Sequence, residues 1–218
     1  KVYVYFGTGQ YFSIDDVPGT PTPNAFATQV ETIYGVIDDQ SVAAPTLPDI
    51  RGTNGSSCPA GGGNGDLVCQ SASRVAADGP FTATHHAVDL STRRGFYVDI
   101  PIAAGRVNTQ PALTTRGTLV FVVNKPSNVV CNPGGTSYLF QFDGATGGAV
   151  VRTLGGTSYF DVGEVVAEAL SSRPVLITTG TGTRALERLS DRTTQSREIV
   201  ETGSAALPFR RIYKRSLD

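Results

Sequence analysis

The chain has 218 residues, of which 39% are hydrophobic and only 17% are charged, and its net charge is -1. This balance disfavours a nucleic-acid partner, because phosphate binding needs clustered positive charge, and no run approaches the ~20 apolar residues of a transmembrane segment. The 25 glycines and 13 prolines favour an all-β protein that is rich in turns.

Period-two alternation of β-branched and aromatic residues predicts short strands along most of the chain. The run 118–125 is almost continuously apolar and has the pattern of a central strand. In 136–143, alternation places Tyr138, Phe140 and Phe142 on one face, and Leu139 and Gln141 on the other. A turn at 144–147 then predicts a hairpin with the strand that follows. The expected strands are 1–6, 28–38, 83–90, 94–102, 106–115, 118–125, 136–143, 148–154, 173–180 and 206–215.

Three segments depart from this strand pattern. Residues 39–80 are rich in Gly, Pro, Ser and Ala, and we expect a long surface loop inserted between strands. Residues 162–171 repeat apolar side chains at helical spacing after a capping box of Asp161 and Glu164, so we expect one short helix. Residues 184–203 are charged with mixed sign, which favours an exposed connection or a mobile helix.

The chain contains three cysteines, two of which flank a glycine-rich stretch inside the predicted insertion. We expect Cys58 and Cys69 to form a disulfide, which would contribute roughly 3 kcal/mol by restricting the unfolded chain. Two free thiols are the alternative, since the compartment is unknown. Cys131 is then free, buried, or bonded to a cysteine outside these residues.

Residue chemistry predicts no catalytic, cofactor-binding or metal site in this chain. His85 and His86 are adjacent and would point to opposite faces of a strand. The pairs Asp15–Asp16 and Asp38–Asp39 lack the spacing of a calcium loop and favour Asx turns. No G-x-S-x-G elbow, P-loop or dinucleotide fingerprint occurs.

Several motifs, in order along nearly the whole chain, resemble those of the PilY family of type IV pilus biogenesis factors and tip-associated adhesins. The runs VYVYFGTGQYFSIDD and TQVETIYGVIDD are similar to the family pattern FGTG-[KR]-Y-L … Q-x-x-Y-G-[IV]-x-D. GFYVDIP resembles G-W-Y-[LV]-D-L-P, with Tyr97 in place of Trp. The stretch CNPGGTSYLFQFDGATGG and the closing RRIYKRSLD match later family motifs, and Tyr213 again replaces a Trp. The positions that carry the resemblance are Gly7, Gly9, Tyr11, Tyr34, Gly35, Asp38, Cys131, Gly134 and Gly135.

The resemblance implies a fold and a place in a longer protein. Residues 1–218 would be the C-terminal part of a modified β-propeller domain, with the surface loop at 39–80, and the remainder of the same protein would complete the ring. The family's calcium loop would lie upstream of Lys1, so calcium is expected only in the full-length protein and no ligand is carried over to this chain.

The resemblance also implies a function, a location and partners. The protein would act without catalysis in pilus assembly, twitching motility and surface adhesion, and would be exported through the periplasm to the pilus tip and cell surface. Minor pilins and a host or surface ligand would be its partners. Two alternatives stay open: a quinoprotein-like propeller enzyme, and a structural subunit of an extracellular fibre whose exposed strand edges pair with another chain.

Overall fold

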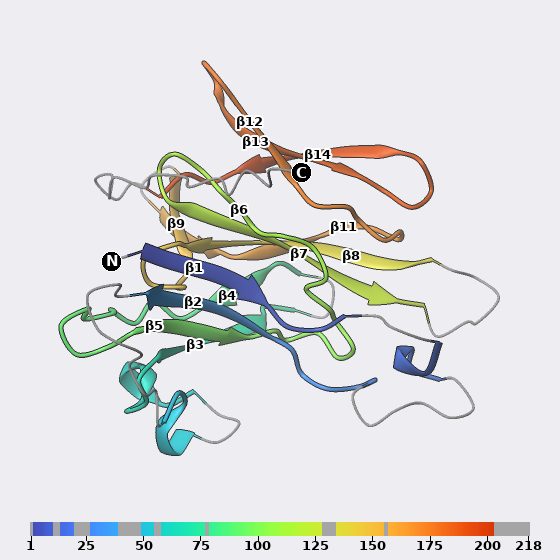
Figure 1. Ribbon diagram of the computed structural model, residues 1–218. Helices are drawn as coiled ribbons and strands as arrows, with labels where there is room; N and C mark the ends of the chain where they lie inside the picture. Colours follow the sequence, from blue (N-terminus) through green and yellow to red (C-terminus); the bar gives the residue numbers. More distant parts are fainter. Residues whose placement is uncertain are drawn as a thin grey trace, which may run out of the picture.

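The computed structural model describes residues 2–10, 14–19, 27–38, 49–54, 58–76, 79–127, 134–154 and 157–202 of the chain (Figure 1). This part of the protein is nearly all β, with fourteen strands in three sheets. Its only helical turns are three short 3₁₀ helices: η1 (Ile14–Asp16), η2 (Gly52–Asn54) and η3 (Ala60–Gly62). The prediction of an all-β protein is confirmed.

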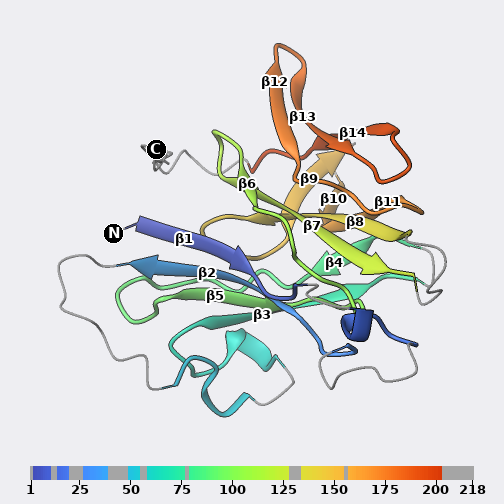
Figure 2. The ribbon, with the colours of Figure 1, turned by 45° about the vertical axis from the view of Figure 1, so that its right-hand side comes forward.

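Nine strands form one large sheet that curls into a half-barrel (Figure 2). Neighbouring strands are antiparallel except β3 and β5, which run parallel. β3 joins the two parts of the sheet, because its first half pairs with β5 and its second half with β4. From edge to edge the strands are β1 (Val2–Gly7), β2 (Thr32–Asp38), β5 (Gly95–Asp99), β3 (Val68–Arg74), β4 (Phe81–Ala83), β11 (Gly163–Ala167), β8 (Gly135–Asp143), β7 (Thr118–Pro126) and β6 (Ala112–Leu113).

A short extended segment links opposite ends of the curled sheet. Arg106 exchanges both backbone hydrogen bonds with Asn124 of β7, at 2.8 and 2.9 Å, and the amide of Val107 donates to the carbonyl of Thr8, 3.0 Å away, just beyond β1. Gly7 permits this approach, because a Cβ atom at that position would collide with the side chain of Val107. Residues 106 and 107 together therefore link the end of β1 to β7.

The main hydrophobic core fills the space inside the curl. Phe96 of β5 and Phe140 of β8 are 0% and 1% exposed and belong to the same cluster, although they come from different parts of the sheet. Tyr3 and Tyr5 of β1 pack against it and donate their hydroxyl groups to the carbonyls of Ala145 and Gly144. The curl is thus held by side chains from both of its ends.

A second core lies on the other face of β7 and β8. There the three-stranded sheet of β12 (Val175–Thr179), β13 (Gly182–Arg188) and β14 (Thr194–Ile199) packs against the large sheet (Figure 1). The predicted alternation in 136–143 is confirmed, since Tyr138, Phe140 and Phe142 join the main core and Leu139 joins the second. The continuous apolar run in β7 is explained by these two cores, one on each face.

Two predictions about the second half of the chain are wrong. The expected helix at 162–171 is absent, and β11 (Gly163–Ala167) lies there instead: Val162, just before this strand, packs in the main core, and Val166 packs in the second core. Alternation there is broken by a register irregularity between Val165 and Ala167, so apolar residues on two faces imitate helical spacing. The charged stretch 184–203 lies largely in β13 and β14, whose buried side chains include the small or polar Thr183, Ala185 and Glu187.

Other boundaries also differ from the predictions. The segment 39–80 is not a loop throughout, because β3 lies within it and pairs with β4 and β5. The strand at 148–154 does not form the expected hairpin: β9 (Val150–Leu154) pairs with β10 (Thr157–Asp161), and a single bridge joins Phe142 to Ala149. Of 83–90 only Ala83 is in a strand, and of 106–115 only β6. The predicted strand 206–215 lies outside the described residues.

The propeller itself stays a prediction. Propeller blades are separate four-stranded sheets, whereas the described strands form sheets of nine, three and two. No helix in the described ranges is long and apolar enough to cross a membrane.

Candidate binding surface

Part of the insertion lies on the outer face of the half-barrel. We call residues 49–54 and 58–67 the outer segment. Its two arms are joined by backbone hydrogen bonds from Asp66 to Asp49 and from Leu67 to Ile50, at 2.9 and 3.1 Å. Leu67 packs with Tyr97 of β5 in a small third core. The outer segment is therefore folded onto the sheet, so this glycine-rich stretch has a defined conformation at the surface.

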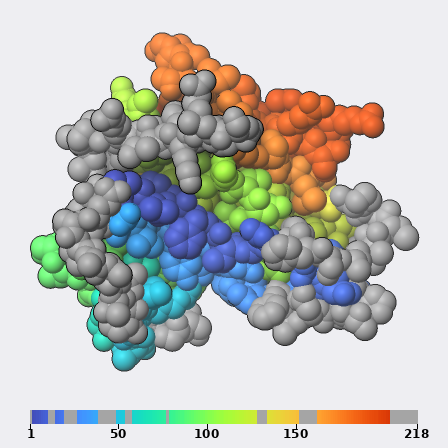
Figure 3. Space-filling model, viewed as in Figure 1, coloured from blue at the N-terminus to red at the C-terminus, as the bar shows by residue number. Residues whose placement is uncertain are grey.

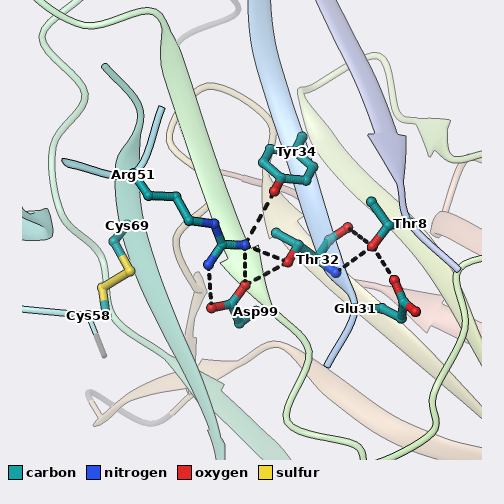
Figure 4. A network of polar contacts seen from close by, with 8 residues as sticks. All are labelled: Thr8, Glu31, Thr32, Tyr34, Arg51, Cys58, Cys69 and Asp99. Atoms are coloured by element: carbon teal, nitrogen blue, oxygen red, sulfur yellow. Dashed lines mark hydrogen bonds and ion pairs between the residues drawn. A yellow bond between two sulfur atoms is a disulfide. The ribbon is translucent and has the colours of Figure 1, made fainter. Parts of the chain in front are cut away.

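One arm is held by a salt bridge between Arg51 and Asp99 at the end of β5 (Figure 4). Both nitrogens of the guanidinium fork donate to the carboxylate, at 2.9 and 2.8 Å, and the group lies 4.4 Å from the centre of the Tyr97 ring. It also donates to the hydroxyl groups of Thr32 and Tyr34 on β2. The hydrogen bond to Asp99 raises the pKa of Arg51 above its ordinary value, against the opposing effect of burial. Only arginine combines a planar fork with stacking in this way.

The other arm is held by a covalent bond, the disulfide between Cys58 and Cys69 (Figure 4). The predicted pairing is confirmed, with Cα atoms 5.5 Å apart and Cys69 at 3% exposed on β3. Arg93 adds hydrogen bonds to the carbonyls of Gly63 and Gly65. Three fastenings thus fix the outer segment: a salt bridge, a disulfide and an arginine that binds backbone.

A chain of polar contacts continues inward from Asp99. Thr32 donates to Asp99 at 2.6 Å, and its backbone amide donates to the Thr8 hydroxyl at 2.9 Å. Thr8 in turn donates to Glu31 at 2.5 Å (Figure 4). Glu31 then forms an ion pair with Arg106 at 2.9 Å, with both side chains at most 5% exposed. The surface salt bridge and the buried ion pair therefore belong to one connected network.

Apolar side chains border this network on the outside. Phe6 of β1 is 43% exposed and stacks on Tyr34, with ring centres 5.1 Å apart. Val4, also on β1, and Ile50, in the outer segment, are 48% and 42% exposed. An exposed aromatic and aliphatic rim beside fixed polar groups is the composition of a recognition surface.

The residues that carry the family resemblance do not gather in one site. Gly9 adopts φ +95°, and a Cβ atom there would collide with Arg106 and crowd Glu31. Gly35 lies against the ring of Phe96, and Asp38 is exposed at the end of β2. Tyr34 is hydrogen-bonded to the polar network, since its hydroxyl group accepts from Arg51.

The last motif lies in a different region. Gly134 and Gly135, at the start of β8, line a cavity of about 600 Å³ together with Lys125 and Glu168. Tyr11 and Cys131 lie outside the described residues. Most of the motif glycines that the structure describes are thus positions where backbone or side chains approach closely, which is a structural requirement rather than a chemical one.

Elsewhere, one buried carboxyl group has an unusual pKa. Glu187 of β13 is 1% exposed, and burial raises its pKa to about 7. One oxygen accepts from Ser171 at 3.3 Å, and the other has no hydrogen-bond partner among the described residues. A pKa near 7 suits a general base, but this side chain is enclosed between two sheets, so we infer that its titration changes the stability of the fold and assign it no catalytic role.

The histidines and aspartates that were considered as metal ligands in the sequence do not form a cluster among the described residues. His85 is exposed, and its Nδ1 lies 3.1 Å from the carbonyl of Ala149. Asp15 and Asp16 are in η1. Within the described ranges, no three His, Cys, Asp or Glu side chains are grouped so that they could hold a metal ion.

Sequence reasoning missed the residues that hold the outer segment. Arg51 lies in a stretch that was predicted to be a loop, so no partner was expected for it. Asp99 is at the end of a strand, where acidic residues are common and do not by themselves indicate a salt bridge. The only signal for the buried pair was Glu31, a charged residue within the predicted strand 28–38. Its partner Arg106 is 75 residues away, and no periodicity links the two.

Comparison of the chain with known proteins found no matching family model, no matching curated protein and no matching solved structure.

Proposed function

We propose that this chain is a non-catalytic adhesion module of a PilY-type protein at the tip of a type IV pilus, in which a rigid β scaffold presents the outer segment to a ligand. The observation that carries the proposal is the ordered series of motifs from FGTG to RRIYKRSLD. On this proposal the half-barrel belongs to a modified propeller completed by the rest of the protein. Minor pilins would anchor it at the cell surface, after export through the periplasm.

The way in which the outer segment is fastened supports this proposal. A glycine-rich loop would lose conformational entropy on binding a ligand, and prior immobilisation reduces that cost. The disulfide also fits an extracellular compartment, where such bonds persist. Calcium, if the full-length protein binds it, would be held by residues outside this chain.

The test is genetic and separates assembly from adhesion. Deletion of the gene should reduce surface piliation and twitching, and the intact gene should restore both. Restoration with Ile50→Lys, which alters only the apolar rim of the outer segment, should restore piliation and twitching but reduce attachment to surfaces.

The matched control is Val75→Lys, which places the same charge on an equally apolar site that is 64% exposed at the end of β3. It should restore all three properties. Normal piliation in the clean deletion would refute the assembly role, and equal attachment by the two lysine variants would refute the role of the outer segment.

A further inference from the structure

We propose that the edge of β12 is a self-association surface, through which two copies of this chain pair antiparallel and join their three-stranded sheets into one. The β12–β13 hairpin projects from the rest of the described chain in both ribbon views and stands at the top of the space-filling view (Figures 1–3). Within the described ranges, β13 is the only strand that pairs with β12.

The edge of β12 lacks the devices that usually prevent such pairing. Natural edge strands are shortened, or they carry charges or proline in the strand. β6 has only two residues, and β14 carries Arg197 and Glu198. β12 reads VLITT, with Val175 at 58% and Ile177 at 43% exposed, and the run 174–183 contains no charged residue.

The hairpin register shows which backbone groups face outward. Thr179 pairs with Gly182 across a two-residue turn. The pair that closes such a turn exchanges both backbone hydrogen bonds, and bonded pairs then alternate along the hairpin. The amides and carbonyls of Val175, Ile177 and Thr179 therefore point to β13, and those of Leu176 and Thr178 point to the open edge.

A second copy fits this edge because the strand is complementary to itself. With a two-fold axis at Ile177, Leu176 lies opposite Thr178 of the second copy, and both such pairs exchange their outward hydrogen bonds. The two Ile177 side chains form the central non-bonded pair, where side chains are closest. No like charges meet across the pairing, because 174–183 is uncharged.

Cross-linking tests the geometry of this pairing. In a Cys131→Ser background, Ile177→Cys should yield a disulfide-linked dimer under mild oxidation, because non-bonded pairs have Cα atoms about 4.5 Å apart. Val175→Cys is the matched control. Each Val175 would lie opposite Thr179 of the second copy, so the two cysteines would be about 13 Å apart at ~3.3 Å per residue. Equal cross-linking of the two variants, or none in either, would overturn the proposal.

Sedimentation of the unmodified 218-residue chain tests the association itself. The chain should show a concentration-dependent monomer–dimer equilibrium. Ile177→Lys, which places two ammonium groups opposite each other, should raise the dissociation constant at least about tenfold. Thr178→Pro, which removes an outward N–H, should do the same, and Val75→Lys should leave it unchanged. A chain that stays monomeric at all concentrations, or a dimer that these substitutions do not weaken, would contradict the proposal.

Discussion

Arg106 and Glu31 form an ion pair with side chains only 2% and 5% exposed, at the point where β1, β2 and the 106–107 bridge meet. Removing one partner of a buried pair leaves an uncompensated charge and costs about 3–5 kcal/mol. Arg106→Met should therefore lower the free energy of unfolding by that amount, as measured by urea denaturation. The double variant Arg106→Met/Glu31→Leu should lose less than the two single variants together, because it leaves neither charge alone. A loss below about 1 kcal/mol in Arg106→Met would contradict this reading.

Glu187 makes the stability of the protein depend on pH. Its pKa in the folded chain is raised to about 7, so the folded state binds this proton more tightly than the unfolded state does. The free energy of unfolding should consequently fall as the pH rises from about 4.5 to about 7. Arg197, whose positive charge partly opposes the shift, and Glu164, which adds to it, are the charged groups that act on this carboxyl.

Glu187→Gln should remove this component of the pH dependence. The variant should be more stable than the parent by ~2–3 kcal/mol at pH 8 and differ little at pH 4.5, since one pKa unit corresponds to about 1.4 kcal/mol. Denaturant titrations across this pH range measure the difference. Glu198→Gln, on the exposed face of β14, serves as the control and should keep the slope of the parent. An unchanged slope in Glu187→Gln would show that the carboxyl titrates normally.

At the scale of the element, the outer segment depends on its fastenings more than on its own packing. Few of its side chains enter a core, and a disulfide that closes a short loop contributes roughly 3 kcal/mol. Reduction, or Cys58→Ser/Cys69→Ser, should therefore loosen this segment without unfolding the half-barrel. Hydrogen exchange is the direct measurement: the amides of Asp66 and Leu67 should lose protection, and those of β7 and β8 should keep it. Loss of protection throughout the chain would mean that the segment is part of the global folding unit.

Element types were predictable where one face of a strand is consistently apolar. The strands in 1–6, 118–125 and 136–143 follow from alternation or from a continuous apolar run. β11 was missed because Val162, just before it, packs in the main core and Val166 packs in the second. β13 was missed because its buried positions include Thr183, Ala185 and Glu187, which conceal the period-two pattern. β3 was missed because VCQSASR has little hydrophobic signal, and its place between β4 and β5 is set by tertiary pairing.

At the scale of the whole molecule, the topology could not be predicted because its decisive contacts join distant residues. Nothing local indicates that residues 106 and 107 bridge β1 and β7, or that β3 runs parallel to β5. The disulfide was predictable because both cysteines flank one glycine-rich stretch and lie only 11 residues apart. The Arg51–Asp99 salt bridge was not, since it links an apparent loop to a strand 48 residues away. A contact between residues close in the sequence, such as the disulfide, could therefore be predicted, whereas the long-range contacts that assemble the candidate surface could not.

The two cores on opposite faces of β8 give a test of how the sheets cooperate. Phe140 and Leu139 are adjacent and at most 1% exposed, but Phe140 packs in the main core and Leu139 beneath the three-stranded sheet. Phe140→Ala should lower the free energy of unfolding by about 3–5 kcal/mol, and Leu139→Ala by about 2–5 kcal/mol. Their hydrogen-exchange patterns should differ: Leu139→Ala should expose the amides of β13 and β14 first, because its cavity lies under that sheet alone. Phe140→Ala should speed exchange in β2 and β5 as well, since its core joins both parts of the half-barrel. Identical patterns in the two variants would instead mean that the half-barrel and the three-stranded sheet unfold as one unit.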